Sequence, residues 1–510
     1  MFRLDHSLRV AAFCVVSLVL VRSMPAQTPP SSLLKAGFAE RDITPDIGME
    51  QPGGYGKSYH RTLHDPCKVR ASVWDDGQTT VAVVGLDALL IRRETVEKVR
   101  QRITAQCGIP GAAVLISASH SHSSGPTGMV LPGEFDGDSP EVQKLAYEKS
   151  SMADPRYLAR VEDALVEAVC AAHASRQSAK VGVGMGLEDQ VAFNRRFRMK
   201  NGTTMTHPRQ GNPDIIEPAG PTDPDVGVIG AWDDQGKLAG CVVNFACHAT
   251  TSPGGISANY IYYLEQAIRG FFGPETIVVF LPGCCGDITQ VDNLSPFVAP
   301  RPEQWARLVG GRVGAEAVKV LLSVEPGAVS PVTYKTKLLD LGRRIPRPER
   351  VAACRELVSR EPGKDPTDWL FAKEIVMLDA LIQRQPRAQV EVQAVQIGPA
   401  VFVTNPAEFF VEFGLGIKRE SPFPFTFPVE LANGCVGYVP TEEALGPRGG
   451  GYETRLTYYS NLEPTAGTQI MRAGIDLAKQ LKPGEVPTRA RVTGWQGSAW
   501  TYGSVPPELD

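Results

Sequence analysis

The sequence lacks any Cys-x-x-Cys pair, although it has ten cysteines in 510 residues. Structural zinc clusters usually take thiolate ligands from such pairs, so a cluster of this kind is not expected. Cys14 lies in an N-terminal segment that we expect to be removed, which leaves nine cysteines. An exported chain can form disulfides, but an odd number leaves at least one thiol unpaired, and the spacing assigns no pairs.

An excess of positive charge is also missing. The chain has 52 Lys and Arg against 56 Asp and Glu, a formal net charge of -4. Nucleic-acid binding requires a basic face, so nucleic acid is not expected as a partner. Low-complexity tracts and tandem arrays are absent as well. The composition, 43% hydrophobic and 21% charged, is typical of a globular protein.

Long apolar runs are absent except near the N-terminus. Arg3 and Arg9 flank the start of an apolar run at 10–21, and the small residue Ala26 follows. The run is short for a membrane span, so it predicts a secretory signal peptide over 1–26, with an uncleaved anchor as the alternative. We expect cleavage near Ala26, a polar leader over 27–34, and a secreted or periplasmic protein.

Strand and helix patterns alternate over residues 35–482. Two similar stretches, 69–87 and 225–248, each predict a hairpin with an Asp-Asp turn, but they are too short to establish a duplication. Further strands are predicted at 179–184, 276–281 and 390–404, and helices at 93–107, 154–174, 302–323, 366–384 and 467–481. This order predicts the α/β class: a mixed β-sheet core flanked by helices, in one large domain over 35–482 with a tail over 483–510. The segment 196–224 is expected to be a long polar loop.

Histidine is scarce, with eight residues in the chain, yet two of them share one short stretch. His120 and His122 lie in SASHSHSSGPTG, directly after the apolar run AAVLI. If the strand continues through both, alternation places both rings on the same side. His248 and Glu408 also follow apolar strands, and imidazole and carboxylate groups are common zinc ligands. The alternative is that each is structural, Glu408 for example as a charge at a helix start.

Two further stretches carry polar groups near predicted strand ends. ELANGCVGYVPT contains Tyr438, which could equally be a core aromatic. FLPGCCGDITQVDN contains Gly283 and Gly286, which allow close approach of the backbone to a ligand, and the polar residues Asp287 and Thr289.

In this order, the motifs resemble those of the neutral, non-lysosomal ceramidases over about residues 35–470. The family's TH-x-HSGPGG, strand-ending His, GDVSPN, PGEF and YVTT…YE motifs are matched at 119–128, 244–248, 286–291, 406–409 and 438–441 with 452–453. Its opening DIT…GYG and its NRS-like element are matched at 42–56 and 194–196. Typical members continue into an immunoglobulin-like domain, for which residues 483–510 are too short.

The resemblance implies a zinc-dependent amide hydrolase that cleaves ceramide-like lipids into a fatty acid and a sphingoid base, with transient contact to a membrane surface. It implies one zinc ion per chain, held by His120, His248, Glu408 and Tyr438. It also implies four catalytic or substrate-contacting residues: His122, which lies beside the metal, and Arg195, Tyr452 and Thr289.

Thr289 departs from the family pattern, because it replaces the family's serine and lacks the following Pro-Asn. We expect water rather than Thr289 to be the nucleophile, since no His–carboxylate pair is evident to activate a threonine. Two other functions stay open. One is a zinc hydrolase that acts on a non-lipid amide or ester, and the other is a secreted, non-catalytic binding protein on the same scaffold.

Overall fold

The computed structural model describes residues 34–495, 497–503 and 505–510. The chain divides into Met1–Ser32 and Leu33–Asp510, and the description below concerns the second unit. The expected signal peptide (1–26) and nearly all of the expected leader (27–34) lie outside the described residues. Within the described ranges, no helix is both long and apolar enough to cross a membrane.

Three mixed sheets form the core, and each follows the same plan. Three antiparallel strands are followed by a helix that leads to a fourth, parallel strand. The first sheet has β1 (Lys35–Asp42), β2 (Lys68–Asp75), β3 (Thr80–Leu86), α1 (Arg93–Cys107) and β4 (Val114–Ala118), with β5 (Gln177–Ser178) at its edge. The second has β6 (Lys180–Leu187), β11 (Asp225–Trp232), β12 (Leu238–Phe245), α4 (Tyr260–Phe272) and β13 (Ile277–Pro282). The third has β15 (Val332–Gly342), β16 (Arg387–Ile397), β17 (Ala400–Thr404), α8 (Val411–Glu420) and β19 (Phe425–Val429).

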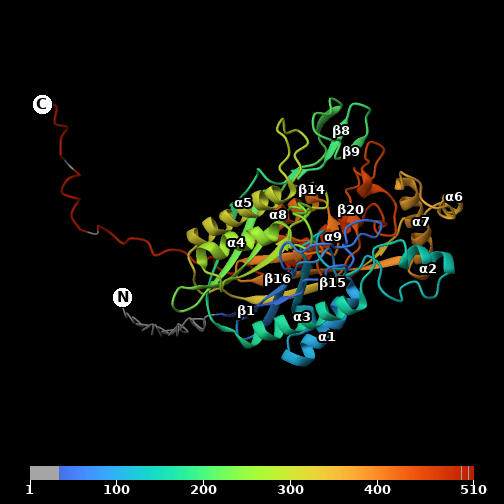
Figure 1. The fold of residues 1–510 in the computed structure, drawn as a ribbon. Helices are drawn as coiled ribbons and strands as arrows, with labels where there is room; N and C mark the ends of the chain where they lie inside the picture. Colours follow the sequence, from blue (N-terminus) through green and yellow to red (C-terminus); the bar gives the residue numbers. More distant parts are fainter. Residues whose placement is uncertain (1–33, 496, 504) are drawn as a thin grey trace, which may run out of the picture. The chain divides into compact units, whose positions relative to one another are not determined.

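A second helix follows the fourth strand of each sheet and packs on that sheet. These helices are α3 (Pro155–Ala174), α5 (Pro302–Ser323) and α9 (Ala466–Lys479). Figure 1 shows α1 beside α3 and α4 beside α5. The order β-β-β-α-β-α therefore occurs three times, and we call each occurrence a repeat. The two hairpins that look alike in the sequence are the equivalent strands β2–β3 and β11–β12.

The three sheets share one buried cluster. Val83 of β3, Val279 of β13 and Val395 of β16 all belong to it. The first two sheets lie close together at Gly85, where an added Cβ would lie 2.3 Å from the Phe280 carbonyl oxygen. A larger side chain at Gly85 would force these sheets apart, so this glycine is required by packing.

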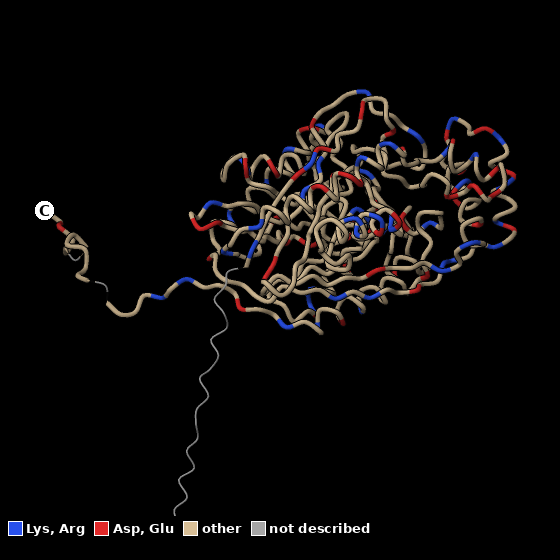
Figure 2. The backbone as a smooth tube through the Cα atoms, turned by 90° about the horizontal axis from the view of Figure 1, so that it is seen from below, with Lys and Arg blue, Asp and Glu red and all other residues tan. Residues whose placement is uncertain are grey.

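Insertions in the repeats supply the remaining elements. The first repeat contains α2 (Pro140–Tyr147), and the third contains α6 (Pro348–Val358) and α7 (Thr367–Arg384); Figure 1 shows these helices at the same end. The other short elements are β7 (Phe193–Asn194), β8 (Arg196–Met199), β9 (Thr204–Thr206), β10 (Ile215–Pro218), β14 (Ile288–Thr289), β18 (Glu408–Phe409), β20 (Tyr438–Val439), η1 (Gly111–Ala113) and η2 (Tyr452–Thr454). In the view of Figure 2, acidic and basic residues are intermixed over the backbone, in keeping with the small net charge.

The predicted α/β class with mixed sheets flanked by helices is confirmed, although there are three such sheets rather than one. The predicted long loop at 196–224 is wrong, because β8, β9 and β10 form a small antiparallel sheet there. Asn201 and Gly202, the latter with φ 81°, form the turn between β8 and β9, and Asn-Gly is a common hairpin signal. The predicted strand at 390–404 is two strands joined by a turn at Gly398. Helices α2, α4, α6 and α8 were not predicted.

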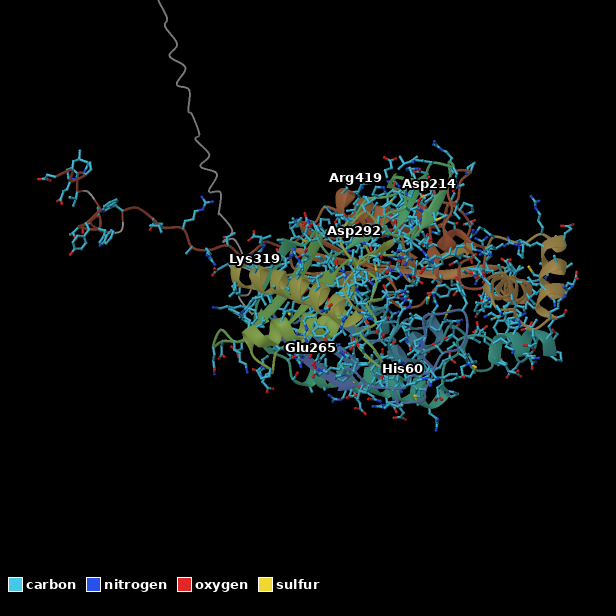
Figure 3. All side chains as sticks on the ribbon, turned by 45° about the horizontal axis from the view of Figure 1, so that its top comes forward. His60, Asp214, Glu265, Asp292, Lys319 and Arg419 are labelled. Atoms are coloured by element: carbon cyan, nitrogen blue, oxygen red, sulfur yellow. The ribbon has the colours of Figure 1, made fainter. Side chains whose placement is uncertain are left out.

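Glu265 ties α4 to the first sheet (labelled in Figure 3). Its buried carboxylate accepts hydrogen bonds from Lys68 Nζ at 2.8 Å and from Arg70, both on β2. Burial alone would raise the pKa of Glu265, but Arg70 and Lys68 outweigh it and lower the pKa to about 2. The ionised form is therefore stabilised in the folded chain.

We expect Glu265→Gln to lower the free energy of unfolding at pH 7 by about 3 kcal/mol, from about 1.4 kcal/mol per pKa unit. Because the folded pKa is depressed, the contribution is complete above about pH 4.5 and is lost as the pH falls towards 2. Urea unfolding at pH 7 and pH 3 measures it, with the exposed Glu275→Gln as control. An equal loss at both pH values would contradict the assignment.

Candidate metal centre

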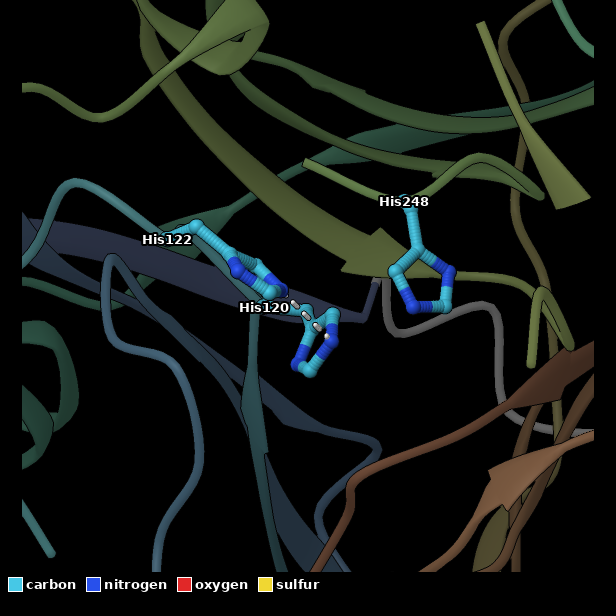
Figure 4. A group of neighbouring side chains, drawn as sticks. All are labelled: His120, His122 and His248. Atoms are coloured by element: carbon cyan, nitrogen blue, oxygen red, sulfur yellow. Dashed lines mark hydrogen bonds between the residues drawn. The ribbon is translucent and has the colours of Figure 1, made fainter. Parts of the chain in front are cut away.

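Three histidines converge where strands of the first and second repeats end. His120 and His122 follow β4, and His248 follows β12. Their candidate ligand atoms all lie within 4.8 Å of one another. Figure 4 shows the His120 ring between the other two, with ring centroids 4.7 Å from His122 and 4.6 Å from His248.

The backbone that brings His120 and His122 together is a turn and not the expected strand. β4 ends at Ala118, and His120 has φ 62°, in the left-handed region. Such a conformation is uncommon for a residue other than glycine and occurs often at functional sites. Both rings still face the same centre. Their convergence was therefore predicted correctly, but strand alternation, the expected cause, was wrong.

Backbone carbonyls fix the tautomers of two of these histidines. His120 Nδ1 lies 2.9 Å from the Leu89 carbonyl oxygen, and His248 Nδ1 lies 2.6 Å from that of Cys285. A carbonyl can only accept, so each Nδ1 carries the proton and each Nε2 presents a lone pair. Hydrogen bonding of the remote ring nitrogen is typical of histidines that bind metals.

Both lone pairs face one carboxylate oxygen. Glu408 Oε2 lies 3.2 Å from His120 Nε2 and 3.0 Å from His248 Nε2. All three side chains are at most 2% exposed. Acceptor atoms at these distances repel one another unless a cation or a proton lies among them, so the donor set fits a metal ion.

Tyr438 joins this group through the short parallel pair β18–β20. Glu408 and Tyr438 are direct partners in that pair, so both side chains leave the same face. The Tyr438 ring lies parallel to His248, with centroids 6.4 Å apart and 7° between the planes. Its hydroxyl oxygen lies 2.9 Å from that of Tyr452. The four predicted ligand residues therefore gather in one place.

Arg195 lies behind the two tyrosines. Its guanidinium donates to the Tyr438 hydroxyl (3.1 Å), to the Gly286 carbonyl (2.7 Å) and to the Glu453 carboxylate (2.8 Å). Burial acts to lower its pKa, but Tyr452, Tyr438 and Glu453 raise the pKa well above its usual value. The site thus contains a permanent, rigidly held positive charge.

The titration states suit metal binding. Burial, with Arg195, lowers the pKa of His248 to about 3, and burial with its histidine neighbours lowers the pKa of His122 well below its usual value. Burial also acts to lower the pKa of His120, but Glu408 reverses the shift and raises it. Burial acts to raise the pKa of Glu408, which His120 and His248 nevertheless hold well below its usual range. His248 is thus held neutral and Glu408 ionised, the forms in which they bind a metal, whereas a metal ion at His120 would replace the proton that Glu408 favours there.

Thr289 lies apart from this arrangement. It is buried in β14, where it pairs with Phe193 of β7. Among the described residues, the hydrogen bond recorded for its hydroxyl is with the Val291 amide at 3.3 Å. The neighbouring Ile288 carbonyl accepts from the His248 amide at 3.2 Å. The catalytic role of Thr289 therefore stays a prediction.

A small cavity of about 60 Å³ adjoins the histidines. It is lined by Gly53, Gly54, Tyr55, Leu89, His120, His122, Met129, Glu408, Tyr438, Tyr452 and Tyr459. Gly53 has φ 113°, and a Cβ there would lie 2.4 Å from His122 Nδ1, so only glycine fits. Gln51 Nε2 also donates to the His122 carbonyl at 3.0 Å. We call residues 50–57 the strap, since they cover this side of His122.

Glu430, which was not predicted as a site residue, supports the segments that hold His248 and Glu408. Its carboxylate accepts hydrogen bonds from the Cys285 and Phe409 amides, each at 2.9 Å. It therefore fixes the loop whose carbonyl holds His248 and the strand that carries Glu408. Burial is the main cause that raises the pKa of Glu430 to about 8. The position of Glu430 at the end of an apolar strand could have identified it as a site residue. The Leu89 and Cys285 carbonyls could not be found in this way, because every residue type has a main-chain carbonyl.

The chain is similar to neutral ceramidase in both sequence and fold. No protein-family model matches the chain. It is 23% identical to the neutral ceramidase of Pseudomonas aeruginosa over 358 residues, which covers 66% of this chain and 49% of the relative. The chain thus spans about half the length of that relative.

Solved structures extend this likeness to the fold. The crystal structure of neutral ceramidase from Pseudomonas aeruginosa matches 90% of this chain and 77% of that chain, with a TM-score of 0.64 and 19% identity. A ceramidase complexed with C2 matches 91% and 77%, with a TM-score of 0.64 and 18% identity. The resemblance that the motifs predicted is therefore confirmed, and the described chain has the neutral ceramidase fold.

Proposed function

We propose that this chain is an exported, zinc-dependent amide hydrolase that cleaves the N-acyl amide of ceramide-like lipids to a fatty acid and a sphingoid base. The convergence of the His120 and His248 lone pairs on one Glu408 oxygen carries the proposal. The similarity in sequence and fold to neutral ceramidase supports the choice of amide chemistry and of a lipid substrate.

The proposed ligands of zinc are His120, His248, Glu408 and Tyr438. Buried nitrogen and oxygen donors of this kind suit zinc. When bound, zinc lowers the pKa of water and polarises a carbonyl group, which together make an amide open to hydrolysis.

The residues around the ligands have distinct tasks. Burial raises the pKa of Tyr452 to about 12, so its hydroxyl stays protonated and can donate to the amide carbonyl. Arg195 holds the Tyr438 hydroxyl and contributes positive charge where negative charge develops. His122 lines the cavity, and its lowered pKa keeps it neutral, so its ring can hydrogen-bond to water or to the developing oxyanion.

One observation favours a second candidate on the same centre. The cavity of about 60 Å³ is much smaller than the roughly 300–1000 Å³ of typical ligand sites. A short amide or ester needs less room than a ceramide, whose chains would have to extend beyond this volume. The non-catalytic alternative has less support, because a binding protein has no need of a complete ligand set.

Purified protein, a metal assay and a panel of N-acyl substrates distinguish these functions. We expect release of a sphingoid base and a fatty acid from ceramide, loss of activity on chelation and recovery with zinc. Cleavage of short amides or esters alone would favour the second candidate. Stoichiometric binding of an N-acyl lipid without any product would favour the binding protein.

We expect Thr289→Ala to lower kcat/KM by about 10- to 1000-fold and Thr289→Ser to stay active, because Thr289 orients groups and is not the nucleophile. Steady-state kinetics measure the loss, and rapid-quench kinetics test for a burst of product. An acyl group trapped on Thr289 and identified by mass spectrometry would overturn this view, since a covalent nucleophile cannot be replaced by alanine.

A further inference from the structure

Within the strap, Lys57 Nζ pairs with Glu50 Oε2 at 2.9 Å, and further contacts join the strap to its neighbours. A short hairpin closes its base, where the Gln51 amide donates to the Ser58 carbonyl at 2.8 Å. Glu50 accepts from the Met152 amide at 3.0 Å. Beyond these contacts the strap runs along the cavity, and Tyr55 at its far part forms a wall of that cavity.

Lys373 of α7 holds the strap at Tyr55. Its side chain is 0% exposed, and its ammonium donates to the Tyr55 carbonyl and to Ser150 Oγ, both at 2.6 Å. It also pairs with Glu374 Oε1 at 2.9 Å. These three short contacts match the three donors of the ammonium, and the Lys149 carbonyl oxygen lies farther away, at 3.4 Å. The Phe371 ring of the same helix lies 5.4 Å from the Tyr55 ring.

A buried lysine at position 373 costs more free energy than an apolar core residue would. Burying an ammonium costs several kcal/mol before pairing, and an aliphatic side chain often serves as well for stability alone. Its neighbours Ala372, Val376 and Met377 on α7 are apolar and buried in a common cluster. The ammonium adds a directed hydrogen bond to the Tyr55 carbonyl of the strap. This bond joins α7, in the third repeat, to the segment between β1 and β2 of the first.

We propose that Lys373 is a positioning residue that holds the strap against His122 and so fixes one wall of the cavity. The kinetic part of this inference rests on the proposed function, whereas the structural part does not. A wall contacts substrate similarly in the ground state and in the transition state, so loosening it weakens binding more than it slows the chemical step.

Hydrogen exchange of the full-length protein tests the structural part without substrate. In Lys373→Met, amides of residues 48–60 should exchange at least tenfold faster, while those of β4 and β12 keep their rates. Ser150→Ala is the matched control, because it removes another acceptor of the same ammonium and leaves the Tyr55 contact in place; it should leave residues 48–60 unchanged.

Lys373→Met leaves the Glu374 charge buried, so the double variant Lys373→Met/Glu374→Gln guards against general unfolding. The double variant should show the same local increase. Unchanged exchange at 48–60, or an increase spread over the whole chain in the double variant, would overturn the proposal.

Kinetics of the same variants test the functional part. We expect KM to rise about tenfold, with kcat within about twofold of the wild type and with unchanged metal content. A merely structural role would instead reduce the active fraction, which lowers kcat and leaves KM unchanged. Locally faster exchange with an unchanged KM would reject the role in substrate binding. If the wild type cleaves no N-acyl substrate, the proposed function fails, and the exchange result alone decides the role of Lys373.

Discussion

Glu408→Gln is expected to lose the metal and to reduce kcat/KM by at least about 1000-fold. The carboxylate faces the lone pairs of both His120 and His248 through a single oxygen. Glutamine has the same shape but no charge, and its neutral amide oxygen is a much weaker ligand than a carboxylate, so the site loses a strong donor and the charge that balances the ion. Metal analysis of the purified variant and kinetics with an N-acyl substrate measure the two effects.

Glu412→Gln is the matched control, because Glu412 is exposed and lies in the first turn of α8, directly after the strand that carries Glu408. It should keep full metal content and activity. A Glu408→Gln protein with stoichiometric, tightly held zinc would exclude Glu408 as a ligand, and one with full activity would remove the metal centre from the mechanism.

Arg195→Lys is expected to lower kcat by about 100- to 1000-fold while the metal stays bound. Arginine donates to Tyr438, Gly286 and Glu453 at once through its planar group, and a lysine cannot make these bonds in the same geometry. His120, His248 and Glu408 still hold the ion, but the Tyr452 hydroxyl, which bonds to that of Tyr438, loses its fixed position, so a donor aimed at the developing negative charge is lost.

The test replaces Arg195 with lysine and not with a neutral residue, because Glu453 is buried. Without a positive partner, its charge would cost about 3–5 kcal/mol of stability. Arg198→Lys, on the same strand region but partly exposed, serves as control and should be near the wild type. A loss of metal in Arg195→Lys would show that Arg195 acts through the Tyr438 ligand and not on the substrate.

Particular features explain how far the sequence predicted this site. His120, His122, His248 and Glu408 each follow an apolar strand, and strand ends of a packed α/β core meet at common edges. Their residue types also limit the chemistry, so both the place and the class of site could be predicted. Arg195 and Tyr452, which no local pattern singles out, came from the family motifs and do meet at Tyr438.

The remainder depends on tertiary contacts that no local pattern encodes. The Leu89 and Cys285 carbonyls orient the imidazoles, but any residue type offers a carbonyl. Lys373 is a charged residue in the middle of an apolar helix, and only the folded chain shows that it meets Tyr55. The number of sheets could not be predicted from the sequence either, because each repeat has different insertions that obscure the common order of strands.

The three repeats have a consequence for when the ion is captured. His120 comes from the first repeat, His248 from the second and Glu408 from the third, so no single repeat presents a complete coordination sphere. A chain with only one or two sheets docked offers one or two donors and holds an ion weakly. If these residues bind a metal ion as proposed, tight binding requires all three repeats to be docked, and the free energy of binding then stabilises their assembly. The ion would cross-link sheets that are distant in the sequence, and its retention would report that the three repeats have assembled.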